Sequence, residues 1–131
     1  IIYTDDSIYG VSASLVDVET DLDVAVLSAN IKLPSVVLGD SDRLTEGQKL
    51  VAITSPAGCK NAIDECLYTG KSYNYGKYHV GISESETGGG SSGGAAFNYD
   101  SKIIGMVILG DSGTNDAVPI NDIKPILEKL K

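Results

Sequence analysis

The sequence lacks several features that would place it in other protein classes. No apolar run approaches the roughly 20 residues that a membrane-spanning helix needs. Basic residues are few, because 10 lysines and arginines stand against 18 acidic residues and the net charge is -8. Nucleic acids and anionic membranes are bound by basic patches, so neither is an expected partner. No secretory signal is visible in the first residues.

Cysteine is equally scarce. Cys59 and Cys66 are not spaced as a C-x-x-C pair, and no further metal ligands lie near them. This argues against a zinc site, and nothing in the sequence calls for another metal or a cofactor. The two residues are either free thiols or a disulfide. We favour the disulfide, because the intervening residues 60–65 are polar and are typical of an exposed excursion. A disulfide would require an oxidising compartment.

The chain is rich instead in glycine, tyrosine and β-branched residues, which favours an all-β fold. Apolar or alternating runs predict strands within residues 1–3, 9–18, 24–27, 49–54, 67–75, 77–83, 95–98, 103–109 and 117–120. The end differs, because Ile123, Ile126, Leu127 and Leu130 have the spacing of one helix face, with Asn121 as the N-cap. Strands nearly throughout and one terminal helix indicate a Greek-key barrel rather than alternating β-α units.

A glycine-rich loop lies between two of the predicted strands. Residues 88–94 read GGGSSGG, a composition typical of a flexible linker. The pattern G-x-S-G-G is also that of a nucleophile loop, in which glycines allow a tight turn that aims amide groups at one point. We favour the nucleophile loop, because the flanking strands place it inside one β domain, whereas a linker joins domains. An unrelated β domain with a linker here remains the weaker alternative.

Six segments occur in the order found in one family. They are residues 23–27 (DVAVL), 38–42 (LGDSD) with Gly47, 52–53 with Pro56 and Gly58, 90–94 (GSSGG), 104–106 (IGM) and 118–121 (VPIN). Through them, nearly the whole chain resembles the trypsin/chymotrypsin-like serine proteases, and within these the bacterial Deg/Htr-type branch. The resemblance implies a chymotrypsin-like double β-barrel with the active site between the barrels. Residues 1–35 would be a remnant of the N-terminal barrel, and residues 36–131 a complete C-terminal barrel with its terminal helix.

The resemblance also implies catalytic roles. Ser92 matches the nucleophile, and Asp23 matches the acid that orients the catalytic histidine, with Asp21 as a local competitor. The backbone amides of Gly90 and Ser92 match the oxyanion hole. A serine hydroxyl needs such partners because it is a poor nucleophile at neutral pH. Ser91 stands where the family often has asparagine or aspartate, and Ala95 stands where it usually has proline. Neither departure removes the nucleophile.

Two further segments match substrate-binding regions of the family. The strand that pairs with an extended polypeptide substrate matches Ile108, Leu109 and Gly110. The wall of the first specificity pocket matches Glu86, Thr87 and Gly88. A Glu86 side chain that points inward would favour a basic residue at the cleavage site, and the alternative is an exposed loop carboxylate. Glu84 and Asp116 could also approach the pocket.

The triad histidine is missing from its expected place. The family has it upstream of the aspartate, but residues 1–78 contain no histidine. The single histidine, His79, lies in a predicted strand between Asp23 and Ser92, where a structural role is the usual one. We therefore expect the C-terminal portion of a serine endopeptidase that is inactive as this fragment. A histidine segment on a separate polypeptide, and a non-catalytic pseudoprotease or peptide-binding module, are the alternatives.

Partners and location follow from the same resemblance. A half barrel leaves unpaired strand edges, which invite self-association. Family habit and the predicted disulfide point to an extracellular or cell-envelope location.

Overall fold

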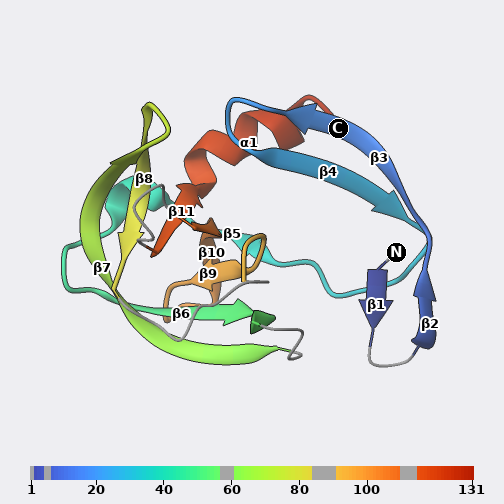
Figure 1. Ribbon diagram of the computed structural model, residues 1–131, viewed down its shortest axis with the longest axis horizontal. Coiled ribbons are helices and arrows are strands. Elements are labelled where there is room, and N and C mark those ends of the chain that lie inside the picture. Colours follow the sequence, from blue (N-terminus) through green and yellow to red (C-terminus); the bar gives the residue numbers. More distant parts are fainter. Residues whose placement is uncertain (1, 5–6, 57–60, 84–90, 110–114) are drawn as a thin grey trace. The chain divides into compact units, whose positions relative to one another are not determined.

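The structure is a computed structural model that describes residues 2–4, 7–56, 61–83, 91–109 and 115–131. The chain divides into two compact units, Ile1–Ser35 and Val36–Lys131 (Figure 1).

The first unit consists of two antiparallel hairpins. β1 (Ile2–Thr4) pairs with β2 (Ser7–Val11), and β3 (Ala13–Glu19) pairs with β4 (Val24–Ala29). The apolar run predicted over residues 9–18 is thus divided between two strands. Leu15 and Leu27 lie directly opposite each other on β3 and β4, and both are exposed. An isolated two-stranded sheet cannot bury such residues by itself.

The second unit is a closed barrel. Its strands are β6 (Lys49–Thr54), β7 (Ala62–Asn74), β8 (Lys77–Ile82), β9 (Ala95–Phe97), β10 (Lys102–Leu109) and β11 (Asn115–Pro119). Their hydrogen-bonded order is β11-β8-β7-β6-β9-β10, and pairing of β10 with β11 closes the ring. The short β5 (Val37–Leu38) runs parallel to the start of β10. The barrel confirms the predicted all-β, chymotrypsin-like fold class.

Alternate residues of these strands fill the barrel. Leu50 and Ile104 are completely buried, and so is Ala96 on the short strand between theirs. The core cluster is formed by Leu50, Ala52, Cys66, Tyr68, Val80, Ile82, Ala96, Ile104, Val107 and Ala117. The inward face therefore draws on every strand of the closed ring, as the period of two along a strand requires.

β7 begins earlier than the sequence suggested. The expectation of an exposed excursion over residues 60–65 is wrong from Ala62 onward, because Ala62 pairs with Thr54 and Glu65 pairs with Val51 on β6. Along this part of β7 the side chains of Ile63 and Glu65 are exposed and Cys66 is buried. Polar residues on the outward face concealed a strand whose inward face belongs to the core.

α1 (Ile120–Glu128) follows β11. Its predicted apolar face is buried at Ile123 and Ile126, whereas Leu130 lies past the end of the helix and is 43% exposed. Ile120, Ile123 and Ile126 are buried, and the helix contacts β10 and β11. Asn121 is not the N-cap as predicted, because Pro119 occupies that position in extended backbone. The fixed φ of proline suits the entry into a helix, and the helix begins at Ile120, before Asn121 rather than after it. No helix among the described residues has the length and apolar character that crossing a membrane would need.

Candidate active site

Ser92 lies at the apex of a tight turn. The Ser91 carbonyl accepts a hydrogen bond from the Gly94 amide at 3.0 Å, so Ser92 and Gly93 occupy the two central positions. Gly93 has a φ of 88°, which the third position of a type II turn requires and which glycine adopts without strain. The side chain of Ser91 is buried, whereas Ser92 is exposed. The turn therefore leaves Ser92 exposed while its neighbour Ser91 is buried.

The turn is fastened to β10 by two backbone hydrogen bonds. The Gly93 amide donates to the Val107 carbonyl at 2.8 Å, and the Val107 amide donates to the Gly94 carbonyl at 2.8 Å. Gly94 must be glycine here, because an added Cβ would lie 2.7 Å from the Ile53 carbonyl oxygen. Residues 91–94 are thus an integral part of the barrel, which does not fit a linker between domains.

β10 continues past this turn into the predicted substrate-binding strand. The β9–β10 ladder ends at Met106, and Val107 is bonded to the turn, so Ile108 has no strand partner on the β9 side among the described residues. On its other side Ile108 pairs with Asp116, and Leu109 pairs with Asn115. A free edge beside Ser92 is the arrangement that backbone pairing with a peptide needs.

Asp23 is the second predicted catalytic residue that the structure describes. Asp23 lies in the first unit, in a turn where its amide donates to the Thr20 carbonyl at 3.3 Å. Its φ is 57°, a left-handed conformation that aspartate tolerates better than most residues. Outside the described residues lie Glu84, Glu86, Thr87, Gly88, Gly90 and Gly110. Their predicted roles stay predictions.

His79 is buried in β8, directly opposite Ser72 on β7. Its Nδ1 atom has no hydrogen-bond partner among the described residues. The His79 ring belongs neither to the exposed turn of Ser92 nor to the strand edge at Ile108.

Asp116 shows what the sequence did not reveal. It is 1 % exposed, and its carboxylate accepts hydrogen bonds from the Ser72 hydroxyl at 3.0 Å and from the Asn74 side-chain amide. Asp116 pairs with Gly81 on β8, and a Cβ at Gly81 would lie 2.5 Å from the Thr69 hydroxyl oxygen. β7 packs so closely on Gly81 that a side chain there would collide with it, and the Asp116 carboxylate reaches past this glycine to β7. The sequence suggested only that Asp116 could approach the specificity pocket, and it gave no sign of these partners on β7.

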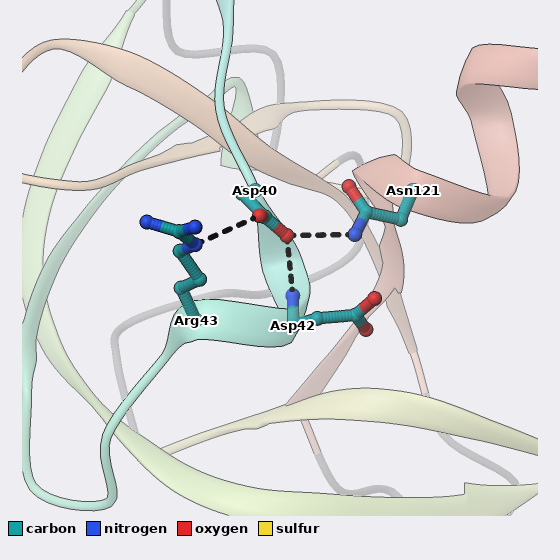
Figure 2. Close-up of polar contacts among 4 residues, drawn as sticks. All are labelled: Asp40, Asp42, Arg43 and Asn121. Carbon is teal, nitrogen blue, oxygen red and sulfur yellow. Dashed lines mark hydrogen bonds and ion pairs between the residues drawn. The ribbon is translucent and has the colours of Figure 1, made fainter.

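A second polar cluster ties the terminal helix to the start of the barrel (Figure 2). The Asp40 carboxylate accepts from the Asn121 side-chain amide at 2.8 Å and from the Asp42 backbone amide at 3.0 Å. The backbone amide of Asn121 donates to the Ser41 hydroxyl in the 3-10 turn η1 (Ser41–Arg43). The Asn121 hydrogen bond, followed by that of Asp42, lowers the pKa of Asp40. Asn121 therefore serves as a tether rather than a cap.

Cys66 is buried and forms no disulfide with another described residue, and burial raises the pKa of its thiol to about 11. Cys59 lies outside the described residues, so its pairing with Cys66 stays a prediction. Among the described residues, no group of three or more histidine, cysteine, aspartate or glutamate side chains is arranged to hold a metal ion.

Comparison with known proteins places these features in one family. Residues 4–106 match the family model described as the trypsin-like peptidase domain. The chain is 32% identical over 135 residues to a probable periplasmic serine endoprotease DegP-like of Rickettsia conorii, which covers 92% of this chain and 27% of that protein. It is 31% identical over 137 residues to the serine protease Do-like HtrA of Bacillus subtilis, which covers 92% of this chain and 30% of that protein.

A solved structure gives the same result. The HtrA-type protease AlgW, determined with a decapeptide, superimposes with a TM-score of 0.78 at 25% identity, over 88% of this chain and 39% of that one. The chain thus spans less than a third of the length of the two curated relatives named above.

Proposed function

This chain belongs to the trypsin-like peptidase family, with Deg/Htr-type relatives, and we propose that it is the C-terminal portion of a serine endopeptidase. The observation that carries the proposal is the exposed residue Ser92 on a turn bonded to β10, next to a strand edge without a partner among the described residues. A linker would have neither the turn nor its anchoring.

In the proposed reaction, the Ser92 oxygen attacks the scissile carbonyl and forms an acyl-enzyme. A histidine takes the serine proton, passes it to the leaving amine, and later activates the water that hydrolyses the acyl group. Asp23 would hold this histidine in orientation, and the amides of Gly90 and Ser92 would stabilise the oxyanion.

The histidine would come from outside these 131 residues. His79 is buried in β8 and is the only histidine of the chain. The chain alone is therefore expected to have little or no peptidase activity, since a serine without a base is a poor nucleophile.

The proposed substrate is an extended polypeptide that pairs with the backbone of Ile108, Leu109 and Gly110. The support is the β10 edge past Val107, because main-chain pairing needs such an edge. The structure of AlgW was determined with a decapeptide, in line with peptide binding on this fold. Glu86 would then favour a basic residue at the cleavage site.

A non-catalytic pseudoprotease or peptide-binding module is the second candidate. It needs only a strand edge for peptide binding, which β10 offers past Val107 among the described residues. For either candidate we propose an extracellular or cell-envelope location, because several relatives are named periplasmic. The unpaired outer edges of the two hairpins, among the described residues, support self-association as a further proposal.

A fluorophosphonate serine probe, read by mass spectrometry, tests the proposal. The 131-residue chain and an N-terminally extended form that includes an upstream histidine are labelled side by side, each with its Ser92→Ala variant. We expect labelling only in the extended form, at Ser92, and none after substitution. If both forms are folded and bind peptide but neither is labelled, the result would support the pseudoprotease. Robust peptide cleavage by the 131-residue chain, lost in Ser92→Ala, would contradict the role given to the missing histidine.

A further inference from the structure

The edge of β10 that we propose for substrate pairing is supported from β11. Ile108 pairs with Asp116 at the beginning of β11, and Leu109 pairs with the residue before it. On the other side of β10, the β9 ladder ends at Met106. The position of the edge therefore depends on what holds the beginning of β11.

The backbone gives the beginning of β11 a short attachment to β8. Among the described residues, the ladder between these strands consists of the pairs Asp116–Gly81 and Ala117–Val80. The ladder between β11 and β10 is longer and runs from Asn115 to Pro119. A side-chain attachment at this end of β11 therefore has a large share in fixing it.

The Asp116 carboxylate provides such an attachment. Directly opposite residues of paired strands share a face, so Ile108, Asp116 and Gly81 lie in one row. The carboxylate passes Gly81 to reach β7, where one oxygen, Oδ2, accepts from the Ser72 hydroxyl at 3.0 Å and from the Asn74 side-chain amide. Asp116 is 1% exposed, and a buried hydrogen bond of a charged group is costly to lose.

The two donors are themselves held in place. The Asn74 side-chain amide also donates to the Ser72 hydroxyl at 2.9 Å. β7 pairs with β6 through residues 62–67 and with β8 through residues 68–74, apart from one irregularity. Asp116 thus ties the end of β11 to a strand that is paired on both sides.

We propose that Asp116 is a positioning residue for peptide substrates. By bonding Ser72 and Asn74 it holds the beginning of β11, and with it the β10 edge, where the substrate backbone pairs. The inference rests on the proposed function, but it concerns peptide binding rather than the reactivity of Ser92. The turn of Ser92 is bonded to β10 at Val107, before this edge begins.

Two kinds of serine-reactive probe separate peptide binding from reactivity in the N-terminally extended form. An alkyl fluorophosphonate needs no strand pairing, whereas Ala-Ala-Leu and Ala-Ala-Lys diphenyl phosphonates carry a backbone that pairs with the edge. Asp116→Ala should slow labelling by the tripeptide probes about tenfold and labelling by the fluorophosphonate less than about twofold. Asp116→Asn keeps an oxygen for both donors and should recover most of the loss. Mass spectrometry measures the labelling rates.

Two further variants separate the attachment from general stability. Ser72→Ala removes one donor on β7 and should slow the tripeptide probes alone, by a smaller factor. Circular dichroism checks folding, and Ser72→Ala decides if Asp116→Ala does not fold. Ile126→Val removes a buried methyl group from α1 and should be labelled as the wild type is by both kinds of probe. Equal slowing of both kinds, or wild-type rates in the Asp116 and Ser72 variants, would overturn the proposal.

Hydrogen exchange of the 131-residue chain tests the attachment without the peptidase reaction. Asp116→Ala should raise deuterium uptake in residues 105–109 and leave residues 49–54 of β6 as in the wild type. If neither kind of probe labels the extended wild type, the proposed peptidase function fails, and exchange decides on Asp116. Raised uptake confined to residues 105–109 would support its role at a peptide-binding edge, and unchanged uptake there would overturn that role.

Discussion

Leu50 and Leu15 occupy comparable places in two different sheets. Both are leucines in short strands of alternating or apolar sequence, yet Leu50 in the barrel is 0% exposed and Leu15 in the first unit is 63% exposed. The difference lies in the number of strands. A closed ring of six strands encloses an interior, whereas the described part of the first unit has two separate two-stranded sheets.

This comparison separates what forms a strand from what stabilises it. Full burial of a leucine side chain contributes roughly 1.5–3 kcal/mol, and the barrel collects such contributions from every strand. We infer that the stability of the 131-residue chain resides in Val36–Lys131, the unit that also carries Ser92.

The largest expected effect tests this difference directly. Leu50→Ala should lower the free energy of unfolding by about 2–5 kcal/mol, because it leaves a cavity in a closed core. Leu15→Ala should change it by less than about 0.5 kcal/mol, as an exposed position does. Urea unfolding followed by circular dichroism measures both. Equal losses would show that Leu15 is buried in solution and would remove the contrast between the two units.

Gly105 and Gly76 contrast a closely packed strand with an open turn. An alanine Cβ at Gly105 on β10 would lie 2.8 Å from the Ala117 Cβ and 2.9 Å from the Val118 oxygen. Gly105→Ala should therefore cost about 2–3 kcal/mol through overpacking. Gly76 lies in the turn between β7 and β8, where an added Cβ would have no described neighbour within 4 Å but φ is 75°. Gly76→Ala should therefore cost only about 1 kcal/mol of backbone strain. Urea unfolding of the two variants ranks these costs, and the reverse order would contradict the close strand packing.

The buried polar cluster of Asp116, Ser72 and Asn74 gives a smaller contrast with the surface. Asp116→Ala removes the acceptor of the Ser72 hydroxyl and the Asn74 amide, and should destabilise the chain by about 1–3 kcal/mol. Asp100→Ala, at an exposed turn, should have an effect below about 0.5 kcal/mol. Thermal unfolding provides the measurement. If the Asp116 variant is as stable as the wild type, the hydrogen bonds of Asp116 do not anchor β7 to β11.

Sequence reasoning succeeded where the determinants were local. The alternating and apolar run at residues 49–54 predicted β6 to the residue, and the G-x-S-G-G pattern predicted the turn of Ser92. It failed where a partner lay far along the chain. Asp116 is buried because Ser72 and Asn74 meet it across the side-chain-free Gly81, and no local pattern reports this.

The same limit explains Asn121. Its position before an amphipathic run is typical of an N-cap, but the acceptor of its side chain, Asp40, lies 81 positions earlier. Local propensity cannot report such a contact. The proposed walls of the specificity pocket lie outside the described residues, so the assignment of Glu86 rests on resemblance alone.

The smallest expected effect concerns Asp40, where the barrel meets α1. Hydrogen bonds from Asn121 and Asp42 hold the pKa of this carboxyl below its ordinary value of 3.8, so folding favours its charged form. That contribution is complete above the ordinary value and is lost as the pH falls through the lowered pKa. The difference in unfolding free energy between the wild type and Asp40→Asn should therefore shrink on acidification below 3.8. Urea unfolding at a series of acid pH values measures it, with Asp42→Asn as control for the loss of one charge from the same turn (Figure 2). A difference that stayed constant with pH would mean that the negative charge of Asp40 does not help to hold α1. The Asn121 amide would then be the only tether.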